Sequence, residues 1–212
     1  MTALVNDSRF MNAQLRNVVL PNAILFQAMW WSCILDHMIL ALVLLVLLWS
    51  HLLWVIGAQA SQSPHSSSSS SSNWRAWASA GFKLIVCLLA FAVIGLLSDG
   101  LWFLLSGYQP ASFSDGQVQQ PVWLLVLWLG FVTTLPTSMV SLMKHAWLWV
   151  GLMAVFGPLA YWVGAQYERL HLADWVIWYV PVQWALLAWL FRFGFVRSGL
   201  LGLESHKQHA RS

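Results

Sequence analysis

The strongest constraint on the fold is an apolar block from Val18 to Gly57 that is broken only by Asp36-His37. As a single straight helix, these 40 residues would be about 60 Å long. The hydrocarbon core of a bilayer is only about 30 Å thick. The block is therefore predicted to form two membrane spans, with the chain reversing direction at Asp36-His37.

The composition extends this interpretation to the whole chain. Only 8% of the residues are charged and 59% are hydrophobic, whereas soluble domains carry roughly 25% charged residues. No hydrophilic block is long enough for a separate soluble domain. The basic residues are scattered, so the formal net charge of +3 does not indicate nucleic-acid binding. Residues 1–19 are polar and mixed, unlike a cleavable signal, and the chain is expected to remain intact.

These features predict an all-α fold, a polytopic transmembrane bundle of six spans. A cytoplasmic N-terminal lead (1–17) precedes the membrane domain (18–195), and a basic cytoplasmic tail (196–212) follows it. The expected spans are 18–35, 38–57, 83–106, 121–141, 146–165 and 175–195. Seven consecutive serines from Ser66 to Ser72 indicate a low-complexity cytoplasmic linker over 58–80. Prolines are expected to kink or interrupt the last three spans, at Pro136, at Gly157-Pro158 and at Pro181.

The distribution of Lys and Arg predicts the orientation, because cytoplasmic loops are enriched in both. With the N-terminus inside, the cytoplasmic segments contain nine of these ten residues, and the outer loops contain only Arg169. The nine are Arg9, Arg16, Arg75, Lys83, Lys144, Arg192, Arg197, Lys207 and Arg211. We therefore expect both termini in the cytoplasm.

Asp99 is the only carboxylate placed well within an apolar run, in Ser98-Asp99-Gly100 of the third span. An intramembrane charge is costly and often marks a functional site. Asp99 could carry a proton, bind a cation or act as a general acid or base. Alternatively, neighbouring Tyr, Ser or Trp side chains hydrogen-bond it, and it holds the bundle together. Tyr161 lies at a similar depth in the fifth span and is the expected partner.

Other polar residues inside the spans complete a candidate pocket. Gln27 lies mid-span, with Asn22 about one turn nearer the cytoplasm, and such amides usually hydrogen-bond across helices. Thr133 and Thr134 lie just before Pro136, with Thr137 and Ser138 after it, and hydroxyls in such positions often satisfy their own helix backbone unless they face a cavity. The candidate pocket comprises Asp99, Tyr161, Gln27, Asn22, Thr133 and Thr134.

The pattern of residues indicates no cofactor, no metal and no complete catalytic site. The histidines are mostly isolated, and His206-Lys-Gln-His209 lacks a third ligand. HExxH, GxSxG and a phosphate-binding Gly-rich loop are all absent from the sequence. The catalytic residues, if there are any, stay unassigned.

Several of these segments occur together in an order that resembles a known family. They are Asn22-Ala-Ile-Leu-Phe-Gln-Ala-Met-Trp30, Gly95 with Ser98-Asp99-Gly100, Pro121-Val-Trp123, Leu127-Trp128, Phe131-Val-Thr-Thr134 and Gly157-Pro-Leu-Ala-Tyr161 with Gly164. The chain resembles, over residues 20–193, a bacterial inner-membrane family called domain of unknown function twenty-eight seventy-eight. The resemblance implies a compact multi-span domain with a shared polar cluster at Asn22, Gln27, Trp30, Asp99, Trp128 and Tyr161. It implies no activity.

Three functions remain open at this point. The first is an inner-membrane protein that binds or handles a lipid-like or small amphiphilic molecule in a pocket around Asp99. The second is a small proton-coupled transporter, which with six spans is expected to dimerise. The third is a membrane scaffold or assembly factor with no chemistry of its own. A membrane enzyme that uses Asp99 as acid or base is disfavoured, because the sequence shows neither a nucleophile–base pair nor a metal triad.

Overall fold

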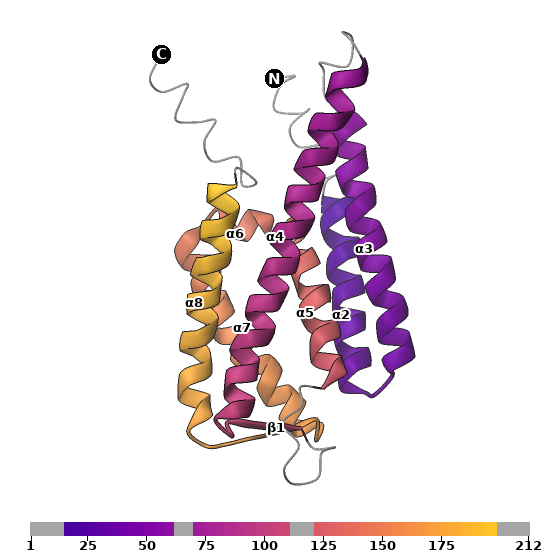
Figure 1. Cartoon of the computed structure of the whole chain (residues 1–212). Helices are drawn as coiled ribbons and strands as arrows, with labels where there is room; N and C mark the ends of the chain where they lie inside the picture. The colour runs from indigo at the N-terminus through magenta and orange to yellow at the C-terminus, as the bar shows by residue number, and fades with distance from the viewer. Residues whose placement is uncertain (1–14, 62–69, 111–120, 199–212) are drawn as a thin grey trace, which may run out of the picture.

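The computed structural model describes residues 15–61, 70–110 and 121–198 (Figure 1). A π-helical turn, η1 (Leu15–Val19), leads into α2 (Leu20–Ile34), which is followed by α3 (Met38–Ser61) and α4 (Ser70–Leu104). The second half of the chain forms α5 (Val122–Thr134), the short α6 (Val140–Met143), α7 (Ala146–Gln166) and α8 (Val176–Arg197). Two short strands, β1 (Tyr108–Pro110) and β2 (Leu170–Leu172), complete the described elements.

Four of the described helices are long and apolar enough to cross a membrane: Met38–Ala58, Ala78–Leu104, Ala146–Gln166 and Val176–Arg197. A span needs about 20 mostly apolar residues, and most of the residues in these four helices face outward rather than into the bundle. The fold is therefore all-α, and its helices are those of a membrane protein. The stretches expected to form the first and fourth spans contain shorter helices, α2 and α5.

The apolar block 18–57 forms two helices, as predicted. α2 ends at Ile34, and Asp36 adopts a left-handed conformation with φ of 66°. The amide of His37 donates to the Ser32 carbonyl at 2.8 Å, and α3 then returns alongside α2 (Figure 1). Asn and Asp reach this backbone region more easily than most residues, which explains why the reversal occurs at this position.

The helices extend further into the expected linker 58–80 than the serine content suggests. α3 continues to Ser61 and α4 begins at Ser70, so the helices include both ends of that segment. Its centre, residues 62–69, lies outside the described residues. Most of the expected N-terminal lead (1–14) and of the basic tail (199–212) lies outside them as well.

The three proline predictions have different outcomes: the span with Pro136 is interrupted, whereas Pro158 and Pro181 do not interrupt their helices. α7 and α8 are continuous helices with Pro158 and Pro181 inside them. Pro181 lies in the second turn of α8, so the carbonyl that it leaves unpaired belongs to the first turn. Pro136, by contrast, follows the end of α5 instead of kinking a longer helix. The fourth expected span is thus a helix, a turn over 135–139 and the short α6.

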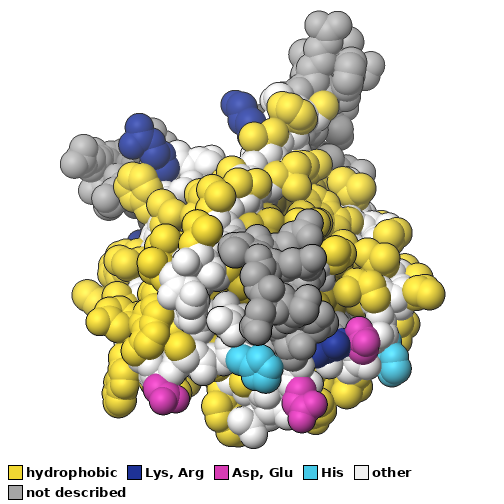
Figure 2. All heavy atoms as spheres, turned by 60° about the horizontal axis from the view of Figure 1, so that its bottom comes forward, with side chains coloured by type: hydrophobic (Ala, Val, Ile, Leu, Met, Phe, Trp, Pro, Cys, Tyr) yellow, Lys and Arg dark blue, Asp and Glu magenta, His cyan; other side chains and the backbone are white. Residues whose placement is uncertain are grey.

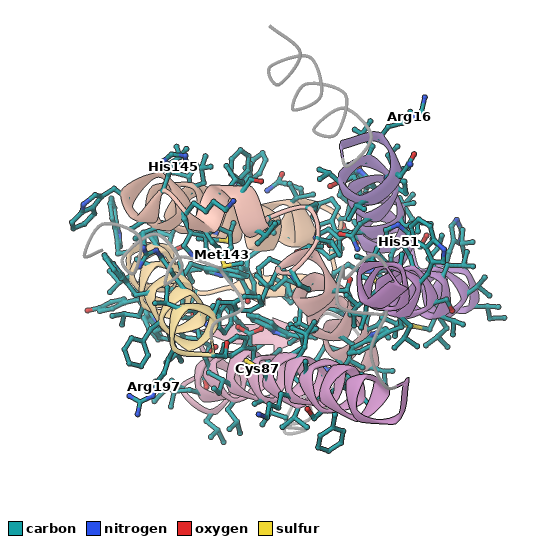
Figure 3. All side chains as sticks on the ribbon, turned by 90° about the horizontal axis from the view of Figure 1, so that it is seen from above. Arg16, His51, Cys87, Met143, His145 and Arg197 are labelled. Carbon is teal, nitrogen blue, oxygen red and sulfur yellow. The ribbon has the colours of Figure 1, made fainter. Side chains whose placement is uncertain are left out.

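A two-stranded antiparallel sheet joins two connections that are distant in the sequence. β1 follows α4 and β2 follows α7, and Tyr108 pairs with Leu172. We call this end of the bundle, together with the α2–α3 turn, the hairpin end. The connections at this end contain Asp36, Glu168 and Asp174. Acidic and histidine side chains are visible at this end in Figure 2. Arg16, His145 and Arg197 lie at the opposite, basic end, which Figure 3 views directly.

The packing places α4 and α5 between two helix pairs. α2 packs on α3 and both contact α5, whereas α7 packs on α8. α4 contacts α5 and α8 and so connects the two pairs (Figure 3). Side chains from all of these elements can therefore meet near the centre of the bundle.

Candidate functional site

Asp99 lies at the centre of the bundle and is completely buried. The indole Nε1 of Trp128 on α5 donates to Oδ2 at 2.7 Å. The hydroxyl of Tyr161 on α7 donates to Oδ1 at 2.6 Å, and the amide of Gln183 on α8 donates to the same oxygen at 3.1 Å. The predicted pair of Asp99 and Tyr161 is thus formed, within a cluster that joins α4, α5, α7 and α8.

The chemistry of the three partners matches that of an ionised carboxylate. A carboxylate can only accept hydrogen bonds, and an indole N–H can only donate. Both oxygens of Asp99 are occupied, and the side chain has no solvent-accessible surface. Such a sealed and fully paired group fits a structural role, because removing Trp128, for example, would leave the buried Oδ2 without a donor.

Gln183 connects this cluster to a second layer of polar groups. Its amide nitrogen also donates to the Ser98 hydroxyl at 2.8 Å, and its carbonyl oxygen accepts a hydrogen bond from the indole of Trp102. The Ser98 hydroxyl in turn donates to the Gly95 carbonyl at 2.8 Å. Gln183 is therefore held in one orientation by three neighbouring groups, Trp102, Ser98 and Asp99 itself, and its amide is directed at Asp99.

Two glycines make room for the aromatic rings around Asp99. A Cβ atom on Gly95 would lie 2.4 Å from the Trp128 ring, and one on Gly157 would lie 2.2 Å from Cγ of Trp184. The two tryptophans stack with ring centroids 5.4 Å apart and planes only 10° from parallel. Any larger residue at either glycine would displace this stack.

A cavity of about 590 Å³ lies against these rings. We call it the α2–α7 groove, because α2 and α7 form its two sides and α5 lies between them. It is lined by Ala23, Phe26, Gln27, Trp30, Ile34, Trp123, Leu124, Leu127, Trp128, Phe131, Thr134, Ser138, Met139, Leu142, Leu152, Met153, Phe156, Gly157, Leu159, Ala160, Tyr161, Val163, Gly164, Leu170 and Trp184. The lining is almost entirely apolar and rich in aromatic side chains.

The groove opens on the side of the bundle. Phe156 and Leu159, which line it on α7, are 55% and 44% exposed, and Gln27 is exposed on α2. Asp99 does not line the groove. Trp128 and Tyr161 do line it, and both donate to Asp99. The carboxylate therefore fixes two side chains of the groove wall.

The six residues of the predicted pocket occupy three different places. Asp99 and Tyr161 form the buried cluster, and Gln27 and Thr134 line the groove with Tyr161. Asn22 is fully buried nearer the basic end, where its Oδ1 accepts from Ser138 at 3.0 Å. The other side-chain atom of that amide, Nδ2, is buried without a partner among the described residues.

The two threonines behave as the more conservative interpretation predicts. Thr133 and Thr134 donate to the carbonyls of Gly130 and Phe131 at 2.7 and 2.6 Å. These bonds satisfy backbone groups next to the helix break at Pro136. For Gln27, the expected bond across helices is wrong, because its side chain has no hydrogen-bond partner in the described part of the chain.

Sequence reasoning missed the contribution of α8 to the site. Neither Gln183 nor Trp184 was placed in the candidate pocket. The available signal was the depth of Gln183, about two turns into the sixth span, which is similar to the depth of Asp99 in the third. Trp184 has no comparable signal, because tryptophan is frequent throughout this chain.

Arg169 links α2 to α7 at the hairpin end of the groove. Its Nε donates to the Ile34 carbonyl at 3.0 Å and its Nη2 to the Cys33 carbonyl at 3.4 Å. Its Nη2 also lies 2.6 Å from the Asp36 carboxylate. These contacts join the last turn of α2 to the connection that follows α7, so they fix the spacing of the two sides of the groove.

Comparison with known proteins identifies the family. The family model described as "Protein of unknown function (DUF2878)" matches residues 19–190. No curated protein and no solved structure gives a significant match. Because the family match covers most of the chain, the protein belongs to this family, and the resemblance inferred from its motifs is confirmed.

Proposed function

We propose that this DUF2878 protein crosses a bacterial inner membrane six times, with both termini in the cytoplasm. Two observations support this topology. Leu15 to Ile34 is a continuous helical stretch of 20 residues, long enough for about 30 Å, and α5, the turn over 135–139 and α6 together extend from Val122 to Met143. Arg16 and Arg197 also lie at one end of the bundle (Figure 3), as the enrichment of Lys and Arg in cytoplasmic loops requires.

The topology can be tested with single cysteines in a background without Cys33 and Cys87. Lys144→Cys lies between α6 and α7 at the basic end, and Glu168→Cys lies between α7 and β2 at the hairpin end. A membrane-impermeant maleimide added to intact cells is expected to label Glu168→Cys only. Labelling of Lys144→Cys from outside, or of both variants, would refute the proposed orientation.

The proposed function is the binding of a lipid-like or small amphiphilic molecule in the α2–α7 groove. The observation that carries this proposal is the cavity of about 590 Å³ itself. Its volume lies in the range of known ligand sites, which are mostly apolar with a few polar groups. Its exposed rim on α7 faces outward from the bundle, where acyl chains would lie in the proposed topology.

Asp99 has an indirect role in this proposal. It accepts hydrogen bonds from Trp128 and Tyr161, and so it holds both rings in the groove wall. Because it is sealed, it is not available to bind a substrate or to pass a proton across the protein in this state. This favours ligand binding over the proton-coupled transport that the sequence left open.

Blocking the groove tests the function directly. The wild-type protein and Ala160→Trp would be extracted with their surrounding lipid into polymer nanodiscs, and co-purified small molecules would be compared by mass spectrometry. Ala160 lines the groove, so a tryptophan there would fill part of it. Val155→Trp is the matched control, because Val155 is exposed on α7 outside the groove lining.

A molecule that is enriched with the wild type and Val155→Trp but lost with Ala160→Trp would support binding in the groove. Identical molecules in all three samples would contradict it. The second candidate, a scaffold, is favoured by the full pairing of Asp99. It predicts that Ala160→Trp has no effect on bound molecules while the protein remains folded.

A further inference from the structure

Some of the polar groups that line the α2–α7 groove already have hydrogen-bond partners within the protein, and others do not. Thr134 and Ser138 line its basic half, and their hydroxyls already donate to Phe131 and Asn22. Trp128 and Tyr161 are committed to Asp99. The indole Nε1 of Trp184, which also lines the groove, is buried without a hydrogen-bond partner among the described residues and is one free donor. Further unpaired hydrogen-bonding groups lie nearer the hairpin end.

Gln27 and Trp30 are such groups. Both line the groove, and neither side chain has a hydrogen-bond partner among the residues that the structure describes. They are three residues apart on α2 and therefore lie on the same helix face, one to two turns from the end of α2 at Ile34. Gln27 offers both a donor and an acceptor, and the Trp30 indole offers a donor.

The lining contains no ionisable side chain other than the phenol of Tyr161. None of its residues is Lys, Arg, His, Asp or Glu. Arg169, at the hairpin end, is paired with Asp36 and with carbonyls of α2. A phosphate or carboxylate inside the groove would thus lose its water without gaining a counter-charge, which is costly at membrane depth.

We propose that the groove takes an uncharged amphiphile with a single oxygen-containing polar group, such as a hydroxyl or a carbonyl, that hydrogen-bonds to Gln27. The inference rests on the proposed function and adds the chemical class and orientation of the ligand. The polar group lies toward the hairpin end, beside Gln27 and Trp30. The hydrocarbon part lies along the apolar wall toward Leu142 and Met153.

Photo-crosslinking with three matched probes tests this inference. The probes share one diazirine-bearing sixteen-carbon chain and end in a methyl group, a hydroxyl or a carboxylate. Each would be added to the full-length protein in phosphatidylcholine nanodiscs, and labelled peptides would be quantified by mass spectrometry. The expected result is about fivefold more groove labelling by the alcohol than by the other two probes, as one additional hydrogen bond predicts.

Gln27→Leu is the decisive variant. It should reduce labelling by the alcohol about fivefold, to the level of the methyl-ended probe, while labelling by the methyl-ended probe stays unchanged and reports an intact groove. Ile24→Leu is the control, because Ile24 is exposed on α2 outside the groove lining. It should change nothing.

The outcomes separate this inference from the proposed function. Equal labelling of the groove by all three probes, or preferential labelling by the carboxylate, would overturn the inference and leave binding of an amphiphile standing. Unchanged labelling by the alcohol in Gln27→Leu would also overturn it. If none of the three probes labels groove residues, or if Ala160→Trp does not reduce their labelling, both the inference and the proposed function are overturned.

Discussion

Replacing Asp99 with asparagine tests the role of the buried cluster most sharply. The substitution keeps the shape of the side chain but converts one acceptor oxygen into an NH₂ donor. The less costly orientation keeps the oxygen toward Tyr161 and Gln183, which both donate to Oδ1. The new NH₂ group then faces Nε1 of Trp128, where the present distance is 2.7 Å.

The expected cost follows from this geometry. The variant loses one hydrogen bond to a charged acceptor and leaves a buried indole N–H opposed by another donor. Losses of this kind cost about 1.5–3 and about 1–3 kcal/mol, and relief from burying a charge offsets part of them. We expect the free energy of unfolding to fall by about 3 kcal/mol.

A double-mutant cycle isolates the proposed cause. Trp128→Phe removes the opposing N–H, so Asp99→Asn should cost only about 1 kcal/mol in the phenylalanine background, a coupling of about 2 kcal/mol. Unfolding would be followed by far-UV circular dichroism in mixed micelles titrated with dodecyl sulfate. Leu97→Ala, at a 69% exposed position of α4, is the control and should change stability by less than about 0.5 kcal/mol. Additive single effects would refute the assigned geometry.

Three further predictions concern the packing around the groove. Gly157→Ala should destabilise the protein by about 1–3 kcal/mol, because the new Cβ would lie 2.2 Å from Trp184. Gly151→Ala on the same helix would place a Cβ with nothing within 4 Å and should stabilise the protein by about 0.5–1 kcal/mol. Thermal unfolding in detergent compares the two variants, and equal effects would contradict the assigned contact. Arg169→Met should lower the free energy of unfolding more than Asp36→Asn does, because Arg169 also binds two carbonyls of α2. Asp36 is 77% exposed, and an exposed ion pair contributes at most about 1 kcal/mol. The dodecyl sulfate titration checks the order of the two variants, and a larger loss in Asp36→Asn would disprove it. Tyr161→Phe should lower the free energy of unfolding by about 1.5–3 kcal/mol, because the hydrogen bond to Asp99 is lost. Tyr179→Phe, at an exposed position of α8, is the control and should have no effect. An unchanged stability of Tyr161→Phe would exclude the hydrogen bond.

The sequence was informative where a polar or charged residue lies in an apolar stretch and must therefore be paired or exposed to solvent. Asp36-His37 interrupts an apolar block that is too long for one span, and the structure turns at that point. Asp99 and Tyr161 are polar residues at similar depths of two spans, and they hydrogen-bond. In each case, the cost of an unpaired polar group in an apolar environment leaves few solutions, so one sequence suffices to predict the outcome.

The sequence was less informative about the helix breaks. Pro136, Pro158 and Pro181 all suggest an interruption, but only Pro136 follows the end of a helix. A proline removes one N–H and disfavours the preceding turn, and whether the helix continues depends on how the freed carbonyl is accommodated. Around Pro136, the Thr133, Thr134 and Thr137 hydroxyls accommodate the break.

What the sequence by itself determined is the all-α membrane character of the chain, the reversal of direction at Asp36-His37 and the pairing of Asp99 with Tyr161. Tertiary structure alone decided that Gln183 completes that pairing, that Trp184 stacks on Trp128, and that Gln27 faces a groove. The reason is that these helices are apolar on nearly every face, since lipid and protein interior have similar polarity. Hydrophobicity therefore predicts which segments enter the membrane, and packing at positions such as Gly95 and Gly157 determines which faces meet.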